Sequence, residues 1–175
     1  MEVEIVDSSL VVPSEETPKH NIWFSNLDLL IAPRNYTPTI TLYRHNGDPS
    51  FFSVETLKAA LAKALVHFYP LAGRVALDED GRLEIQCTGE GTLFVVAWSA
   101  STLDIVLCDF RPSEEMRQLL VPSVESTECM CILLQVVTFF KCGGSVLGHR
   151  HAPRSHGWLQ RAPFHQHVVR HSPGS

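Results

Sequence analysis

Apolar residues recur at helical spacing in one segment of the chain, residues 57–68. They lie three or four positions apart, which predicts a helix with one buried stripe. Ser53 is a good N-cap for this helix, and Glu55 lies in the first turn, where the helix dipole favours an acid. Tyr69-Pro70 is expected to end the helix, because proline disfavours helical geometry in the residue before it. The stripe consists of Leu57, Ala60, Leu61, Ala64, Leu65 and Phe68.

Other segments have the patterns of strands. Residues 3–12, 39–43 and 92–96 are rich in β-branched and apolar residues. The segments RVAL and RLEIQC flank DEDG, in which Asp80-Gly81 predicts a two-residue hairpin turn. Residues 131–140, CILLQVVTFF, predict a strand that is buried on both faces. With short helices expected at residues 27–31 and 114–120, the predicted fold class is α/β, a mixed sheet with packed helices.

Composition narrows the possible functions. A chain of 175 residues that is 45% hydrophobic and 19% charged suits one globular domain with a substantial core. Its net charge of -5 gives no electrostatic reason to expect a nucleic-acid partner. The first residues carry acids where a signal peptide carries bases, and the longest apolar stretch is too short to cross a bilayer. We therefore expect a cytoplasmic protein with no membrane partner. The five cysteines form no CxxC pair and are expected to be free, mostly buried thiols.

Several stretches up to Gly144 together resemble a known family. In chain order they are ETPKHNIWFSNLDLL, TPTITLYR, LKAALAKALVHFYPLAGR, DGRLEIQC, EGTLFVVA and LLQVVTFFKCGG. FYPLAGR and TFFKCGG are specific in this order and spacing. The chain resembles the start of the plant BAHD acyltransferases, in particular the hydroxycinnamoyl-CoA:shikimate/quinate hydroxycinnamoyltransferases. On this resemblance we place an incomplete N-terminal acyltransferase domain at residues 1–144.

The resemblance implies a two-domain enzyme of chloramphenicol-acetyltransferase-like fold, of which this chain holds a truncated first domain. Such enzymes move an acyl group from a CoA thioester, which is a co-substrate rather than a bound cofactor, to an alcohol or an amine. In the family, the histidine of an HHxxxDG motif shortly after KCGG is catalytic. As a base, it makes the acceptor hydroxyl nucleophilic, work that suits a neutral imidazole near pH 7.

The resemblance also suggests substrate-binding residues. In hydroxycinnamoyltransferases the strand that corresponds to TPTITLYR helps to line the acyl pocket. Thr37, Thr39 and Thr41 are the matching positions, and they alternate, so on a strand they face one way. Thr41 stands where the family typically has a tyrosine, which leaves the acyl preference open. An ordinary β-branched strand is the alternative interpretation.

The sequence after Gly144 departs from the family. It reads SVLGHRHAPRSHGW where HHxxxDG is expected, and no Asp or Glu follows Glu128. Six of the nine histidines lie at or beyond His149, and the last lysine is Lys141. An abrupt change of composition of this kind suggests a change of reading frame.

One extra nucleotide just after the Gly144 codon accounts for the departure. Each codon of the original frame would then consist of the last two bases of one codon of the present chain and the first base of the codon that follows it. Under this rule Ser145 to Gly148 can encode V-S-L-G, and Ala152 to Trp158 can encode HHAVTDG, whose glycine is forced by the single tryptophan codon. Later codons allow F-S-A and F-I-N-T-W-S, which the family commonly has there. We therefore predict that residues 145–175 are an out-of-frame, disordered tail.

The tail and the preceding turn have simpler interpretations as well. The HxH pairs His149/His151 and His165/His167 could bind zinc or nickel, but no cysteine or acid accompanies them, so no metal ligand is assigned. Cys142 could act as a nucleophile, but it is assigned to a structural turn with Gly143 and Gly144. No catalytic residue is assigned in the chain as written.

Two functions remain open. The first is transfer of a hydroxycinnamoyl group from CoA to a hydroxyl acceptor such as shikimate or quinate, with this chain inactive because it lacks the base and the second domain. The second is a non-catalytic truncated fragment or pseudoenzyme that binds a ligand, a metal through its histidines, or a full-length relative. The chain itself is expected to be a monomer or a poorly soluble fragment, because strand 131–140 would lack the cover of a second domain.

Overall fold

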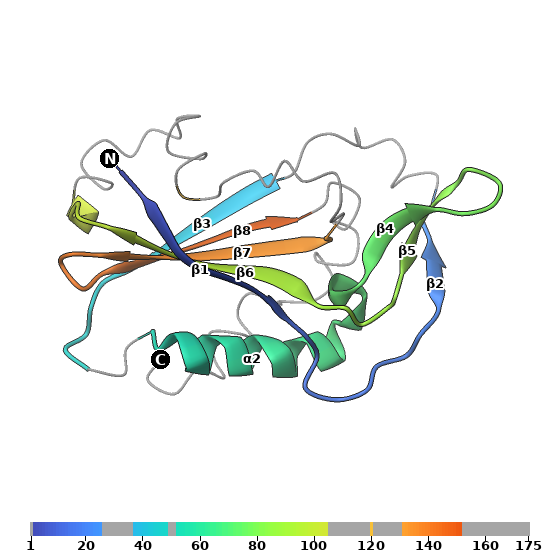
Figure 1. Ribbon diagram of the computed structural model, residues 1–175, viewed down its shortest axis with the longest axis horizontal. Helices are drawn as coiled ribbons and strands as arrows, with labels where there is room; N and C mark the ends of the chain where they lie inside the picture. The colour runs from blue at the N-terminus through green and yellow to red at the C-terminus, as the bar shows by residue number, and fades with distance from the viewer. Residues whose placement is uncertain (1, 26–36, 49–51, 105–119, 121–130, 152–175) are drawn as a thin grey trace.

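The structure, a computed structural model, describes residues 2–25, 37–48, 52–104, 120 and 131–151. Five strands form its larger sheet, in the order β1-β6-β7-β8-β3 (Figure 1). Strands β6 and β7 run parallel, and all other neighbours in this sheet are antiparallel. The predicted mixed sheet is therefore confirmed. Its strands are β1 (Glu4–Val11), β3 (Thr37–Tyr43), β6 (Thr92–Ser99), β7 (Leu133–Phe140) and β8 (Ser145–His151).

A smaller sheet stands at one end of the molecule (Figure 1). It has the order β2-β5-β4, with β2 (Asn21–Trp23), β5 (Leu83–Gln86) and β4 (Arg74–Leu77) all antiparallel. The predicted hairpin between β4 and β5 is present, but its turn is longer than two residues. Leu77 pairs with Leu83, and the side chain of Asp78 accepts hydrogen bonds from the backbone N–H groups of Asp80 and Arg82. Because Gly81 has a φ of 75°, the turn closes through this glycine after Asp80.

Helix α2 (Val54–His67) covers one face of the larger sheet, and a 3₁₀ turn, η1 (Tyr69–Ala72), follows it (Figure 1). Ser53 caps the helix as predicted, since its side chain accepts a hydrogen bond from the Thr56 backbone N–H at 3.5 Å. Lys58 on the helix forms an ion pair with Asp7 on β1, at 2.8 Å between Nζ and Oδ2. The helix and the edge of the sheet are thus tied by a surface contact as well as by their core.

The main core lies between α2 and the larger sheet. The helix contributes the predicted stripe except Phe68, which packs against its edge. The sheet contributes Phe94, Val96, Leu133, Val137 and Leu147, in alternate positions of three adjacent strands. We call this the α2 face. The intervening residues, such as Val95, Val136 and Val146, form two further buried clusters on the opposite face. Strand β7 is therefore buried on both faces, as its sequence predicted.

Two expectations need correction, on the order of the tail and on the cysteines. Others concern segments that lie outside the described residues. Residues 145–175 were expected to be disordered, yet Ser145–His151 form β8 between β7 and β3. S-V-L-G and V-S-L-G are made of the same small and apolar residues, so this segment can pair as a strand in either reading frame. Cys87 and Cys142 are free, but Cys131 is disulfide-bonded. The helices expected at residues 27–31 and 114–120, and residues 152–175, lie outside the described residues.

Candidate active site

The pairing of β3 with β8 decides which residues the three candidate threonines meet. Thr37 pairs with His151, Thr39 with His149 and Thr41 with Leu147. Leu147 belongs to the core beneath α2, and side chains two positions apart on a strand share a face. Thr39, Thr41 and His149 therefore lie on the α2 face of the sheet. The sequence predicted that the threonines face one way; their pairing with β8 emerges only from the sheet.

One row across this face is polar. Gln135 of β7 pairs with His149, and His149 pairs with Thr39. The side chains of Gln135 and His149 are 2% and 6% exposed, whereas Thr39 is exposed at the edge of the sheet. Apolar core residues flank this polar row along β7, where Leu133 precedes and Val137 follows Gln135. We refer below to Thr39, His149 and Gln135 as the polar row.

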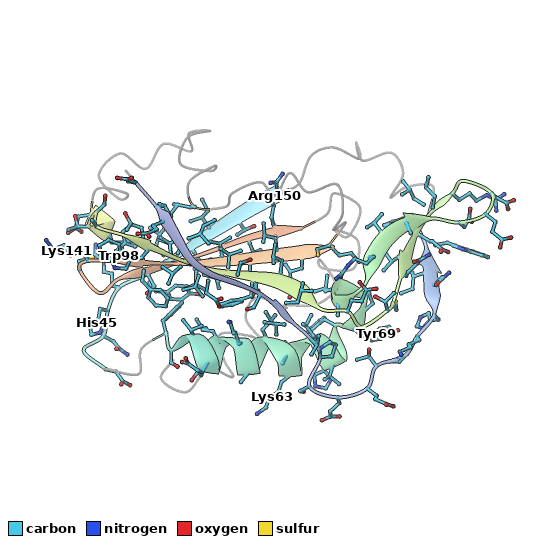
Figure 2. All side chains as sticks on the ribbon, viewed as in Figure 1. His45, Lys63, Tyr69, Trp98, Lys141 and Arg150 are labelled. Atoms are coloured by element: carbon cyan, nitrogen blue, oxygen red, sulfur yellow. The ribbon has the colours of Figure 1, made fainter. Side chains whose placement is uncertain are left out.

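Strand β8 begins at the KCGG turn, which lies at the end of the strand remote from His149 and His151. Phe140 donates its backbone N–H to Gly144, and Gly143 donates to Phe140, at 3.0 and 2.8 Å. Gly143 has a φ of 80°, a conformation that favours glycine, and a Cβ there would lie 3.2 Å from the His45 ring. Figure 2 shows His45 and Lys141 near this end of the sheet, far from Arg150. The turn therefore fixes where β8 starts and, through its register, where the polar row lies.

Cys142 serves this turn structurally. Its Sγ accepts a hydrogen bond from the Leu103 backbone N–H at 3.3 Å. The side chain lies in an exposed turn, and the histidines of β8 are at the other end of that strand. The contact supports the structural assignment and does not form a nucleophile–base pair.

Arg74, which closes the FYPLAGR motif, also has a structural role. Its guanidinium donates hydrogen bonds to the carbonyl oxygens of Gly73 and Gly91, at 2.9 and 2.8 Å, and pairs with Glu90 at 3.2 Å. These contacts tie the start of β4 to the loop before β6. The specificity of the motif in sequence thus reflects a loop anchor, while the acyl-pocket candidates come from other segments.

The described residues contain few other candidate sites. A pocket of about 580 Å³ lies between residues 12–19 and the loop at Thr88 and Gly89, away from the polar row in sequence and sheet. Within the described ranges, no three potential ligands among His, Cys, Asp and Glu gather around a common point. The same ranges contain no helix long and apolar enough to cross a bilayer. His156, His165, His167 and His171 of the tail lie outside them.

Sequence reasoning overlooked Gln135 as a site residue. The sequence feature that could have identified it is the single amide within CILLQVVTFF. Burial of a polar side chain in a central strand costs free energy unless the side chain is hydrogen-bonded. The structure shows that this residue stands in one row with a candidate pocket threonine.

Comparisons with known proteins identify the family of the chain. Residues 1–152 match the Transferase family, so the match runs through β8 and past Gly144. Putrescine hydroxycinnamoyltransferase 1 of Oryza sativa subsp. japonica is 55% identical over 151 residues, covering 85% of this chain and 34% of that protein. Shikimate O-hydroxycinnamoyltransferase of Nicotiana tabacum is 46% identical over 151 residues, with the same two coverages. The chain thus spans about a third of the length of these relatives.

Solved structures share the fold. The crystal structure of vinorine synthase matches with a TM-score of 0.69 and 28% identity, over 87% of this chain and 38% of that one. The structure of F. sporotrichioides TRI101 complexed with coenzyme A and T-2 has the same TM-score at 20% identity, over 87% and 39% of the two chains. With the family match over residues 1–152, these similarities show that the chain belongs to the BAHD acyltransferases of the Transferase family.

Proposed function

We propose that the enzyme to which this chain corresponds transfers a hydroxycinnamoyl group from a CoA thioester to a small acceptor. The observation that carries the proposal is the register of β3 on β8. It places Thr37, Thr39 and Thr41 alongside the strand that leads from the KCGG turn toward the expected HHxxxDG segment. A pocket beside that strand would hold the acyl group close to a base at its end, as proximity catalysis requires.

We also propose that this chain as written does not catalyse the transfer. No histidine after KCGG is followed four positions later by an aspartate. The hypothesis of one extra nucleotide after the Gly144 codon accounts for this absence. Without a base near the acceptor hydroxyl, the alcohol attacks the thioester carbonyl far more slowly, since positioned general bases contribute about 10²–10⁴-fold.

Two buried hydroxyls support the slipped frame. Ser145 Oγ and Thr138 Oγ1 are both enclosed, and neither has a hydrogen-bond partner among the described residues. Val146 pairs directly with Thr138, while Ser145 pairs with Phe139 on one side and Tyr43 on the other. The order V-S that the shifted frame restores would place valine between the two aromatic residues and serine opposite Thr138. Both orphaned hydroxyls would then be removed or satisfied.

The acceptor has two candidates. The resemblance of the sequence led us to shikimate or quinate, hydroxyl acceptors. The identity to the rice putrescine enzyme, 55%, exceeds that to the tobacco shikimate enzyme, 46%, over segments of equal length. This difference favours an amine acceptor as the second candidate. Both require the same base function, which removes a proton from the attacking oxygen or nitrogen.

The proposal also covers the cellular location and the binding partners of the protein. A cytoplasmic location suits a reaction that uses acyl-CoA, and the partners are then two small molecules, the thioester and its acceptor. We expect neither nucleic acid nor membrane as a partner. A metal-binding or relative-binding fragment remains the alternative for the chain as written, and it would act through the tail or through the apolar residues exposed on β1, Ile5, Val6 and Leu10.

Reading the transcript across the codons for Gly143 to Ser145 tests the frame, and an enzymatic assay tests the function. We expect one extra nucleotide there in the transcript or its gene model. The frame-corrected protein should turn over p-coumaroyl-CoA with shikimate or putrescine, while the chain as written should not. A corrected protein that is inactive with every acceptor would refute the proposed function, and turnover by the present chain would refute its inactivity.

A further inference from the structure

Cys131 is the one cysteine among the described residues that is oxidised. It is disulfide-bonded, whereas Cys87 and Cys142 are free thiols. The partner of Cys131 therefore lies outside the described residues, where the sequence has Cys108 and Cys129. Cytoplasmic disulfides are uncommon, because glutathione and thioredoxin keep thiols reduced, and most of those that exist are transient and redox-sensing. A disulfide in a chain for which we propose a cytoplasmic location is thus a candidate for redox control.

The position of Cys131 connects this disulfide to the centre of the larger sheet. Cys131 comes directly before Ile132 and Leu133, which are both 0% exposed, and Leu133 begins β7. Strand β7 is the middle strand of the five and is buried on both faces (Figure 1). The disulfide therefore restrains the chain at the point where it enters this central strand.

The backbone of Cys131 also contacts the smaller sheet. It forms an isolated antiparallel bridge with Arg74, the first residue of β4. The Arg74 guanidinium in turn donates hydrogen bonds to the carbonyl oxygens of Gly73 and Gly91. Because the entry to β7 and the start of β4 meet at this bridge, a covalent bond at Cys131 restrains both of them.

Reduction of such a disulfide consumes two glutathione thiols. A glutathione thiolate attacks one sulfur of the protein disulfide, and the other sulfur leaves as a thiolate that takes up a proton. A second glutathione thiolate then attacks the mixed disulfide, which releases the other protein thiol and glutathione disulfide. The protein gains two electrons and two protons, and two glutathione molecules are oxidised. Cys131 is half-buried, unlike the enclosed Cys87, and so lies at the border of the core where this exchange can take place.

We propose that the disulfide of Cys131 is a redox-sensitive clamp on the entry to β7. In the oxidised form it restrains the bridge to Arg74 and the first residues of the strand. In the reduced form this end of β7 opens locally, while the rest of the sheet is held by its own strand pairing and by α2. The inference rests on the proposed cytoplasmic location and is independent of the proposed acyl transfer. It concerns residues encoded before Gly144, so it applies in either reading frame.

Equilibration of the full chain in glutathione buffers, from fully oxidised to fully reduced, tests the inference. Acid quenching, alkylation and peptide mapping would follow the oxidation state of Cys131, and amide hydrogen exchange would follow Ile132 and Leu133. We expect the disulfide in the oxidised buffer and its loss when reduced glutathione is in large excess. Reduction should speed amide exchange at Ile132 and Leu133 by about tenfold or more and leave Val146 and Leu147 of β8 unchanged.

Two variants separate this disulfide from the other thiols. Cys131→Ser should show fast exchange at Ile132 and Leu133 in both buffers, and Cys131→Ala serves if the serine variant does not fold. Cys142→Ser removes a free thiol in the turn after β7 and should respond to the buffers as the parent chain does.

Three results would overturn the redox role. They are a free Cys131 thiol in the oxidised buffer, a disulfide that survives a large excess of reduced glutathione, and reduction that leaves exchange at Ile132 and Leu133 unchanged. None of them bears on acyl transfer, which the turnover assay of the frame-corrected protein tests separately.

Discussion

Exchange of two adjacent residues, Ser145→Val with Val146→Ser, should stabilise the chain. The exchange keeps composition and length, and it restores the order that the shifted frame encodes. Ser145 is fully buried, and its hydroxyl has no hydrogen-bond partner among the described residues. Valine at this position would instead pack between its cross-strand neighbours Phe139 and Tyr43, both of which border the main core. Tyr43 is itself half-buried, and burial raises the pKa of its phenol.

The gain can be estimated from the two hydroxyls. Leaving a buried donor or acceptor unsatisfied costs about 1–3 kcal/mol. The exchange removes this cost at position 145 and offers Thr138 a serine hydroxyl directly across the strand pair. The burial of one valine is moved from position 146 to position 145, both fully enclosed, so the apolar contribution changes little. The free energy of unfolding should rise by about 2–4 kcal/mol, equivalent to about 4–16 °C in Tm for a chain of this size.

Thermal and urea unfolding followed by circular dichroism would measure the change. Thr138→Val provides an internal check. Its effect on the free energy of unfolding should have opposite signs in the parent chain and in the exchanged chain. In the parent chain it removes an orphaned hydroxyl and should stabilise by about 1–3 kcal/mol. In the exchanged chain it leaves the serine hydroxyl introduced across the strand pair buried without its partner and should destabilise by about 1–3 kcal/mol. If the exchange is neutral or destabilising, or if Thr138→Val has the same effect in both backgrounds, the argument from buried hydroxyls is wrong.

Three other measurements test particular contacts of the described residues. Gly91→Ala should destabilise by about 1–3 kcal/mol more than Gly47→Ala in urea unfolding, because both glycines have positive φ but only at Gly91 would the new Cβ overlap backbone, the Val11 carbonyl; equal losses would contradict this. Ser53→Ala should cost about 1 kcal/mol of stability through loss of the N-cap, and Ser53→Thr should retain most of it. A thiol reagent at pH 8 should label the exposed Cys142 well before Cys87, whose pKa is raised by burial, and peptide mapping that finds Cys87 labelled first would contradict the described burial.

The helix and most strands could be predicted from local pattern. The stripe of α2, its Ser53 cap and its end before Tyr69 are properties of residues close in sequence, and the structure has them at nearly the predicted positions. The hairpin between β4 and β5 was also predictable, but its turn was not. Asp78 accepts two backbone hydrogen bonds and so stabilises a longer turn than the Asp-Gly pair alone suggests.

The site divides differently between sequence and structure. Alternation along TPTITLYR was enough to predict that Thr37, Thr39 and Thr41 share one face, because side chains alternate on any strand. Which residues they meet depends on strand order, and β3 lies beside β8, more than a hundred residues later in the chain. No local pattern specifies such a pairing, since it depends on how the whole sheet buries its apolar residues.

The tail shows the same division. Codon arithmetic applied to the sequence alone found a coherent family motif one base out of step after Gly144. It could not decide whether Ser145–His151 would pair, and the structure shows that they do, because small and apolar side chains suit a central strand in either order. The sequence by itself identified the family resemblance and led to the hypothesis of a frame change after Gly144. Only the tertiary structure placed Ser145 and Thr138 in enclosed positions, where a hydroxyl without a hydrogen-bond partner lowers the free energy of unfolding.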